Sequence, residues 1–208
     1  MNIELVMQFN DAYAEMGNIA AERARQYCDR HGYKLRVFRD MPIVGDPFWS
    51  KVKRLRLISL EPRAFDAYLF WMDADTLILD LDYPLTNLIS SDGMDISQDS
   101  NGLCTGVFGV HTKTKSRTLL GIWLFLGQVR DETEFGQPGL HEQATLMLLE
   151  REFPAVRSMI HRIPESVVSC PTTGLADCAG AFIHHFWART RNPAEVAAEM
   201  RARLKSTS

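Results

Sequence analysis

Apolar runs alternate with amphipathic segments over the first hundred residues of the chain. The runs Ile3–Phe9, Tyr33–Phe38 and Ala67–Met72 are expected to form strands, and the segments at about Gly17–Arg30 and at Ser50–Leu60 to form helices. The first helical segment places its apolar residues at spacings of three and four, and its other face is charged. The run AYLFWM (67–72) is apolar throughout, which is typical of a central strand buried on both faces. This alternation predicts parallel strands joined by right-handed crossovers, with ligands at the carboxyl ends of the strands.

The second half of the chain shows a less regular pattern. Its expected elements are strands at Leu77–Leu79, Met94–Gln98, Cys104–Val110 and Ala181–Phe186, and helices at Lys115–Val129, Leu140–Glu150 and Pro193–Leu204. Two loops, Arg130–Gly139 and Ser169–Gly180, separate some of these elements. No internal repeat, low-complexity segment or linker is present, so a single α/β domain spanning residues 1–208 is expected.

Composition and charge narrow the class of protein. The 208 residues are 46% hydrophobic and 24% charged with a net charge of −3, which is ordinary for a globular protein. The basic residues form no long tract, which argues against a nucleic-acid binder, since such proteins normally need a basic face to neutralise phosphates. The chain enters a strand-like run at Ile3 without a signal peptide, and no apolar run approaches the ~20 residues that span a bilayer. The four scattered cysteines could form two disulfides, but reduced thiols and a cytoplasmic location are favoured.

Two carboxylates, Asp73 and Asp75, follow the apolar run at the point where the backbone is expected to leave the sheet. In an extended or tightly turned D-x-D segment both carboxylates can converge on one hard cation, which can then bridge to a diphosphate. Sugar transfer from a nucleotide diphosphate needs such a cation, because the leaving group accumulates negative charge as the anomeric bond breaks. A carboxylate pair beside an apolar strand is also costly unless a charged group compensates it. These points favour metal binding.

A second D-x-D, Asp80-Leu81-Asp82, shows how weak such a short motif is by itself, and we interpret it as a solvated turn. His184 and His185 are candidates to complete a metal site, because imidazole with carboxylates suits Mn²⁺ somewhat better than Mg²⁺. Adjacent residues of a strand point to opposite faces, so at most one histidine is expected to reach the metal. The pattern alone does not decide which.

Two further segments are candidates for chemistry. Glu142 and Gln143 open an expected helix, where Glu142 is either a base or electrostatic stabiliser, or an acidic first-turn residue favoured by the helix dipole. Lys51 begins a basic helix, where it either contacts donor phosphate or belongs to a solvated charged face.

Five motifs, in this order, resemble one family: the galactosyl/mannosyl/xylosyltransferases related to yeast α-1,2-galactosyltransferase and the plant xyloglucan xylosyltransferases. The matching segments are His31-Gly32-Tyr33 (HGY), Trp49-Ser50-Lys51 with Trp71-Met72-Asp73-Ala74-Asp75 (W-x-K … W-[IVM]-D-x-D), Cys104-Thr105-Gly106-Val107-Phe108 (N-T-G-x-F), Glu142-Gln143 (D-[DE]-Q) and Ile183-His184-His185-Phe186 (HF). Together they cover the chain from about Ile3 to Trp187.

The resemblance implies a GT-A fold, a Rossmann-like α/β fold whose mixed, mostly parallel sheet is flanked by helices. It implies a nucleotide-binding half at about residues 1–100, an acceptor half at 101–192 and a C-terminal helix at 193–204. The donor would be a UDP- or GDP-sugar and the acceptor a glycan or another hydroxyl compound. The cation would be Mn²⁺, with Mg²⁺ as the alternative, and transfer would retain the anomeric configuration.

The resemblance also assigns expected roles to residues. The metal ligands would be Asp73, Asp75 and His185, since His185 directly precedes Phe186. Gln143 would lie under the anomeric centre with Glu142 beside it as the catalytic pair. The expected donor-binding residues are Gln8, Phe9 and Asn10 at the nucleotide base, together with Lys51, Asp73, Ala74, Asp75, Thr105 and Gly106.

Two residues depart from the family pattern. Cys104 stands where the family usually has asparagine, and His141 stands where an acidic residue is common. The sequence shows no membrane anchor like that of the eukaryotic members, so a soluble microbial or viral enzyme is expected. Two alternatives remain: a haloacid dehalogenase-type phosphatase, although Leu77 stands where its D-x-D-x-[TV] motif has threonine or valine, and a degenerate nucleotide-sugar-binding protein.

Overall fold

The computed structural model describes residues 1–40, 47–62, 66–90, 92–99, 102–129, 141–169, 180–186 and 191–206. Its strands are β1 Asn2–Gln8, β2 Lys34–Phe38, β3 Ala67–Met72, β4 Thr76–Ile78, β5 Met94–Asp99, β6 Gly102–His111, β7 Ile160–Arg162, β8 Val168–Ser169 and β9 Ile183–His185. Its α-helices are α1 Ala14–His31, α2 Ser50–Ser59, α3 Thr114–Val129, α4 His141–Glu152, α5 Pro154–Arg157 and α6 Pro193–Ser206. Short 3₁₀ turns at Asp11–Tyr13, Pro47–Trp49 and Leu85–Asn87 join some of them.

The central sheet has six strands in the order β2-β1-β3-β6-β5-β7. β1 pairs in parallel with both β2 and β3, β6 runs antiparallel between β3 and β5, and β7 is parallel to β5. A second sheet, in the order β4-β9-β8, lies beside it. The expected mixed α/β architecture is confirmed, with β3 near the centre of the main sheet.

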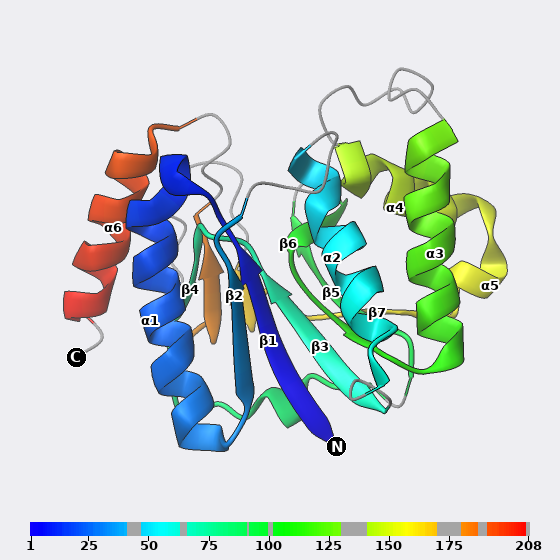
Figure 1. The fold of residues 1–208 in the computed structure, drawn as a ribbon. Coiled ribbons are helices and arrows are strands. Elements are labelled where there is room, and N and C mark those ends of the chain that lie inside the picture. The colour runs from blue at the N-terminus through cyan, green and yellow to red at the C-terminus, as the bar shows by residue number, and fades with distance from the viewer. Residues whose placement is uncertain are drawn as a thin grey trace.

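Strand β3 is buried on both faces, as its composition predicted. Tyr68 and Phe70 face a core shared with α1, α6 and the second sheet, whereas Leu69 and Trp71 face a core shared with α2, α3 and α4. Figure 1 shows the two helix groups on opposite sides of the sheet, α1 and α6 on one and α2, α3 and α4 on the other. The carboxyl ends of β1, β2 and β3 therefore share one edge, between the two groups.

Three short elements were not expected from the sequence: α5, β7 and β8. Each has four residues or fewer, which is too short to display the period of a helix or a strand. The predicted loops 130–139 and 169–180 lie almost wholly outside the described residues, as do Cys170 and Cys178. The other two cysteines, Cys28 and Cys104, are both buried, and neither forms a disulfide among the described residues.

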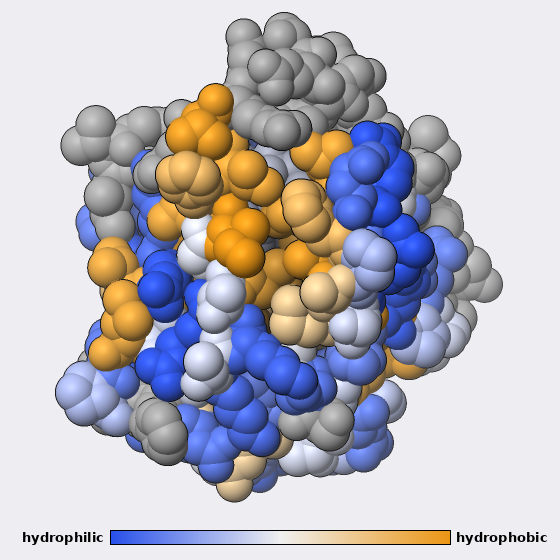
Figure 2. Space-filling view, turned by 90° about the vertical axis from the view of Figure 1, so that its right-hand side faces the viewer, coloured by the Kyte–Doolittle hydropathy of each residue, from blue (hydrophilic) through white to orange (hydrophobic). Residues whose placement is uncertain are grey.

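The surface over α3, α4 and α5 carries an apolar area bordered by hydrophilic side chains (Figure 2). On α3, the exposed apolar residues Ile122, Phe125 and Val129 follow one another at spacings of three and four, so they form a stripe along one side of the helix. Among the described residues, no helix combines the length and the apolar character that crossing a membrane requires.

A buried hydrogen bond ties the centre of the sheet to β5. The Tyr68 hydroxyl donates to Asp95 Oδ2 at 2.8 Å, and the absence of a side chain at Gly109 leaves room for the hydroxyl, since a Cβ there would lie 1.9 Å from it. Burial raises the pKa of Asp95, while the hydrogen bonds from Tyr68 and Ser90 oppose that rise. The folded state therefore favours the protonated acid, and this contribution to stability is lost as pH rises through the folded-state pKa.

We expect Tyr68→Phe to lower the free energy of unfolding by about 1–3 kcal/mol near pH 7, because the buried carboxylate loses a donor. Without that donor the pKa of Asp95 rises further, so the cost of the substitution should grow from about pH 4 to pH 7. Urea denaturation of the wild type and the variant between about pH 4 and pH 7 measures this change in unfolding free energy. A cost independent of pH would contradict the coupling between the Tyr68 hydroxyl and the Asp95 carboxylate.

Candidate active site

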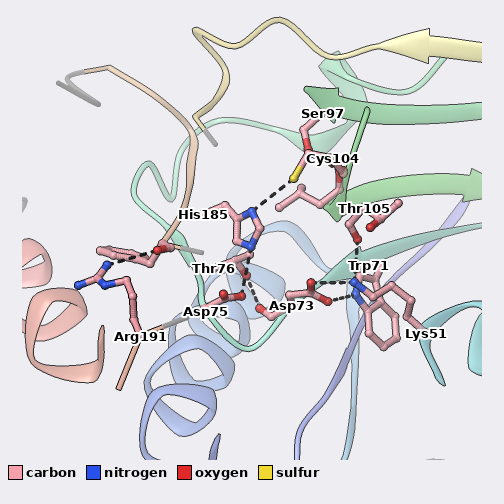
Figure 3. Close-up of polar contacts among 12 residues, drawn as sticks. Lys51, Trp71, Asp73, Asp75, Thr76, Ser97, Cys104, Thr105, His185 and Arg191 are labelled. Atoms are coloured by element: carbon pink, nitrogen blue, oxygen red, sulfur yellow. Dashed lines mark hydrogen bonds and ion pairs between the residues drawn. The ribbon is translucent and has the colours of Figure 1, made fainter. Parts of the chain in front are cut away.

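The D-x-D segment forms a tight turn at the carboxyl end of β3. The Thr76 backbone N–H and hydroxyl both donate to the Asp73 carbonyl, at 3.2 and 2.6 Å, so the chain reverses within four residues and Ala74 packs into the core. Ligand atoms of Asp73, Asp75 and His185 all lie within 4.8 Å of one another. Figure 3 shows the His185 ring, which belongs to the second sheet, pointing toward Asp75, while the Asp73 carboxylate beside them points toward Lys51 and Trp71.

Strand β9 fixes His185 over the D-x-D turn. Thr76 and His185 are partners in the antiparallel β4–β9 ladder, and the Phe186 N–H donates to the Asp75 carbonyl at 2.8 Å. His185 Nε2 lies 3.3 Å from Asp75 Oδ1. Burial lowers the pKa of His185, but the neighbouring Asp75 and Cys104 outweigh burial and raise it well above the usual range.

His184 points away from the carboxylates, as the alternation of a strand requires. Its ring packs edge-on against the Phe186 ring, with 4.4 Å between the ring centroids, and the His184 side chain is buried. Burial, together with His185 and Arg203, lowers the pKa of His184 to about 4, so its imidazole is neutral near pH 7. One histidine of the pair, His185, therefore lies at the carboxylates.

A bulge in β6 carries the next part of the site. Ile96 of β5 pairs with Phe108, but the following residue, Ser97, pairs with Cys104, so three residues of β6 (105–107) have no partner in β5. The Ser97 hydroxyl donates to the carbonyls of Cys104 at 3.1 Å and of Val107 at 2.8 Å, one at each end of the bulge. Bulges of this kind redirect side chains beside active sites.

Gly106, at the centre of the bulge, allows the imidazole to approach the backbone. A Cβ at this position would lie 2.3 Å from Cε1 and 2.7 Å from Nε2 of His185. The Gly106 carbonyl also accepts a 2.9 Å hydrogen bond from the Asp73 N–H, which joins the bulge to the D-x-D turn. Only glycine leaves this space free.

Lys51 lies buried between two carboxylates from different elements. Its Nζ is 2.8 Å from Asp73 Oδ2, 3.3 Å from Glu142 Oε1 and 3.2 Å from the Thr105 carbonyl. Burial lowers the pKa of Lys51, but Asp73 and Glu142 outweigh it and raise the pKa above the usual range. Lys51 is thus a fixed cation beside the D-x-D turn and does not belong to a solvated face.

The start of α4 brings Glu142 and Gln143 to the same place. Burial raises the pKa of Glu142, although Lys51 and a 2.8 Å hydrogen bond from the Thr105 hydroxyl act in the opposite direction. The Trp123 indole N–H donates to the Glu142 carbonyl at 2.7 Å and holds this end of the helix. The buried Gln143 Nε2 has no hydrogen-bond partner among the described residues, so its N–H groups are available to a ligand.

Trp71 holds Asp73 in a way that the sequence analysis missed. Its indole N–H donates to Asp73 Oδ1 at 2.6 Å, while Lys51 binds the other oxygen of the same carboxylate. The two residues are separated by one position, so their side chains leave the strand on the same side. A tryptophan two residues before the first aspartate was the available signal.

The three residues expected at the nucleotide base lie at the carboxyl end of β1. Gln8 Nε2 donates to the Asp40 carbonyl at 3.2 Å, and its Oε1 is buried without a partner among the described residues. The Arg39 guanidinium lies 4.8 Å from the centre of the Phe9 ring, and the Asn10 side chain accepts a hydrogen bond from the Ala12 N–H. Their contact with a nucleotide stays a prediction.

The remaining candidate residues make contacts with nearby side chains or backbone groups. Asp80 Oδ1 accepts from the Asp82 N–H at 2.8 Å, and Asp82 is largely exposed and paired with Arg30, so the second D-x-D is a solvated turn. His141 stacks on the Phe48 ring with 4.1 Å between centroids. Cys104 Sγ lies 3.4 Å from His185 Nδ1.

The three converging side chains suit a divalent cation. Two carboxylates supply hard oxygen ligands and one imidazole supplies a nitrogen ligand, a set that divalent ions such as Mn²⁺ accept. The space for the imidazole exists because residue 106 is a glycine. The site is thus an Asp-Asp-His cluster that could bind a metal, beside a buried lysine.

Residues 4–95 match the family described as the galactosyl transferase GMA12/MNN10 family. The chain is a glycosyltransferase. The matched region includes Lys51 and both aspartates of the D-x-D turn, and it confirms the resemblance drawn from the sequence. No curated protein matches the chain in a sequence search.

Solved structures share the fold of this glycosyltransferase at low sequence identity. One is a glycosyltransferase involved in the glycosylation of the major capsid of PBCV-1, with a TM-score of 0.78 and 16% identity over 97% of this chain and 100% of that one. Mouse xyloside xylosyltransferase 1 has a TM-score of 0.56 and 12% identity, over 91% and 99% of the two chains. GlyE of Streptococcus pneumoniae TIGR4 has a TM-score of 0.55 and 12% identity, over 100% of this chain and 64% of that one.

These likenesses confirm the GT-A fold of the glycosyltransferase. The order of the strands argues against the phosphatase alternative, whose nucleophile would follow the first strand. Asp73 follows the third strand along the chain instead, in a mixed sheet that matches glycosyltransferases.

Proposed function

We propose that the chain transfers a hexose or pentose from a UDP- or GDP-sugar to a hydroxyl group of a glycan or another acceptor, with retention of the anomeric configuration. The convergence of Asp73, Asp75 and His185 at the carboxyl end of β3 carries this proposal. In an open α/β sheet, that edge is where ligands bind.

The proposed metal ligands are Asp73, Asp75 and His185, and the proposed ion is Mn²⁺, with Mg²⁺ as the alternative. A divalent ion bound there supplies positive charge for the diphosphate as it leaves. Lys51 already supplies a second, permanent positive charge 2.8 Å from Asp73. A diphosphate at this edge would therefore be held partly by a residue of the chain.

Glu142 and Gln143 are proposed to have different roles in the active site. Glu142 is buried against Lys51 and Thr105, so its carboxylate is already engaged within the protein. We propose that the Glu142 carboxylate keeps Lys51 protonated and holds its side chain in position. The Gln143 N–H groups have no partner among the residues that the structure describes, and we propose that this amide contacts the transferred sugar near the anomeric centre.

The two ends of the chain are proposed to serve the two substrates. Residues 1–100 hold the nucleotide, with Gln8, Phe9 and Asn10 at the base. Ala74 of this half lines the donor sugar together with Thr105 and Gly106, which lie just beyond it in the sequence. Residues 101–192 hold the acceptor, followed by the C-terminal helix. The buried Gln8 Oε1 is an acceptor for a base N–H, which both uracil and guanine provide.

Calorimetric titration with UDP- and GDP-sugars, first with Mn²⁺ and then with EDTA, tests the proposal. We expect one nucleotide class to bind in the presence of Mn²⁺, and EDTA to abolish that binding because the diphosphate loses the bridging cation. Equal binding in EDTA, or no binding of any nucleotide sugar, would overturn the proposed function. A chain that bound no metal would favour the degenerate-binder alternative.

A further inference from the structure

The Cys104 thiol lies on the far side of the His185 ring from the aspartates. Its Sγ is 3.4 Å from Nδ1, whereas Nε2 of the same ring is 3.3 Å from Asp75 Oδ1. The imidazole is thus held between a carboxylate at one nitrogen and a sulfur atom at the other (Figure 3). Both cysteine and histidine are buried, at 2% and 6% exposure, so little water competes for this contact.

The backbone at Cys104 is fixed, which makes the contact a feature of the fold. Cys104 is the last β6 residue before the bulge, and its carbonyl accepts a hydrogen bond from the buried Ser97 hydroxyl at 3.1 Å. The ring is held equally firmly, because His185 belongs to β9 and packs against Gly106. Neither partner can move far without breaking a strand pairing.

We propose that Cys104 is a positioning residue of the metal site that orients His185, and this inference rests on the proposed function. A histidine binds a cation through the lone pair of one nitrogen, so the ring proton has to reside on the other nitrogen. When Nε2 faces the cation, Nδ1 carries the proton and donates it to Cys104 Sγ. When the ring is neutral and Nε2–H instead donates to Asp75, the thiol S–H donates to Nδ1.

A thiol serves both arrangements because it is a weak donor and a weak acceptor. Alanine and valine offer neither role, although valine fills the space at this position. Serine offers both roles in a smaller side chain. These three replacements therefore separate hydrogen bonding from packing.

Calorimetric titration of Mn²⁺ into the nucleotide-free protein tests the inference. We expect Cys104→Ala and Cys104→Val each to weaken Mn²⁺ binding by about 10-fold or more, as the loss of a partner behind a metal ligand typically does. Cys104→Ser should recover most of the affinity. Cys28→Ala is the matched control, because Cys28 is equally buried but its thiol bonds to the Lys34 carbonyl rather than to His185, and it should leave Mn²⁺ affinity unchanged.

The outcomes separate the inference from the proposed function. If Cys104→Val preserves the Mn²⁺ affinity and Cys104→Ser does not, Cys104 acts only by filling space. The inference is then wrong, while the proposed metal site is unaffected. If the wild-type protein binds no Mn²⁺, the proposed function and the inference both fail.

Discussion

Replacing Asp75 with alanine is expected to weaken Mn²⁺ binding by at least about 100-fold, more than the loss of a residue behind a ligand usually costs. Asp75 supplies one of three converging ligand atoms and is also the carboxylate that faces His185 Nε2 at 3.3 Å. Its removal takes away both a ligand and the charge that faces the ring. Donor binding that depends on Mn²⁺ should be lost with it.

Calorimetry with Mn²⁺ alone, and then with the nucleotide sugar, measures both effects. Asp82→Ala is the matched control, because Asp82 belongs to the second D-x-D but lies exposed beside Arg30. It should bind Mn²⁺ and donor as the wild type does. Wild-type Mn²⁺ affinity in the Asp75 variant would show that the D-x-D turn is not the metal site.

The D-x-D turn could be predicted from sequence because its signal is local. Six consecutive apolar residues ending in two aspartates with one residue between them leave few alternatives to a buried strand with carboxylates at its end. The choice of His185 over His184 could not be made from a local sequence signal. It required a family resemblance, because strand alternation shows only that the two histidines differ.

The bulge in β6 could not be predicted, because it exists only in the pairing with β5. Residues 105–107 have the composition of an ordinary strand, and nothing in their own sequence shows that Ser97 pairs with Cys104. A prediction from hydrophobic pattern therefore gives the strand but not the direction of its side chains. The contacts of Gly106 and Cys104 with His185 follow from that direction.

The ion pairs of Lys51 could not be predicted for a related reason, although the family resemblance placed this residue at the donor. It begins a helix with several basic residues, and such a pattern usually marks a solvated face. Its partners come from two other elements: Asp73 at the end of β3, and Glu142 in α4. Glu142 lies 91 residues after Lys51 in the sequence. Only the tertiary arrangement shows that this lysine is buried while its basic neighbours are more exposed.

Gly106→Ala is expected to disable the metal site by displacing His185. The new Cβ would lie 2.3 Å from Cε1 of the ring, a distance that real Cβ atoms essentially never show, so the ring or the bulge has to move. The ring is held by β9 and the bulge by Ser97, and overpacking of this kind costs about 1–3 kcal/mol of stability. Mn²⁺ affinity should fall by about 10-fold or more, since the imidazole leaves its position.

Gly121→Ala is the matched control, since the same substitution in α3 places a Cβ no closer than 3.7 Å to the Arg56 side chain. It should leave Mn²⁺ binding unchanged and stabilise the helix by roughly 0.5–1 kcal/mol. Urea denaturation and Mn²⁺ calorimetry on both variants separate folding from binding. If Gly106→Ala loses stability but keeps wild-type Mn²⁺ affinity, His185 is not a ligand, and the metal is held by the aspartates without it.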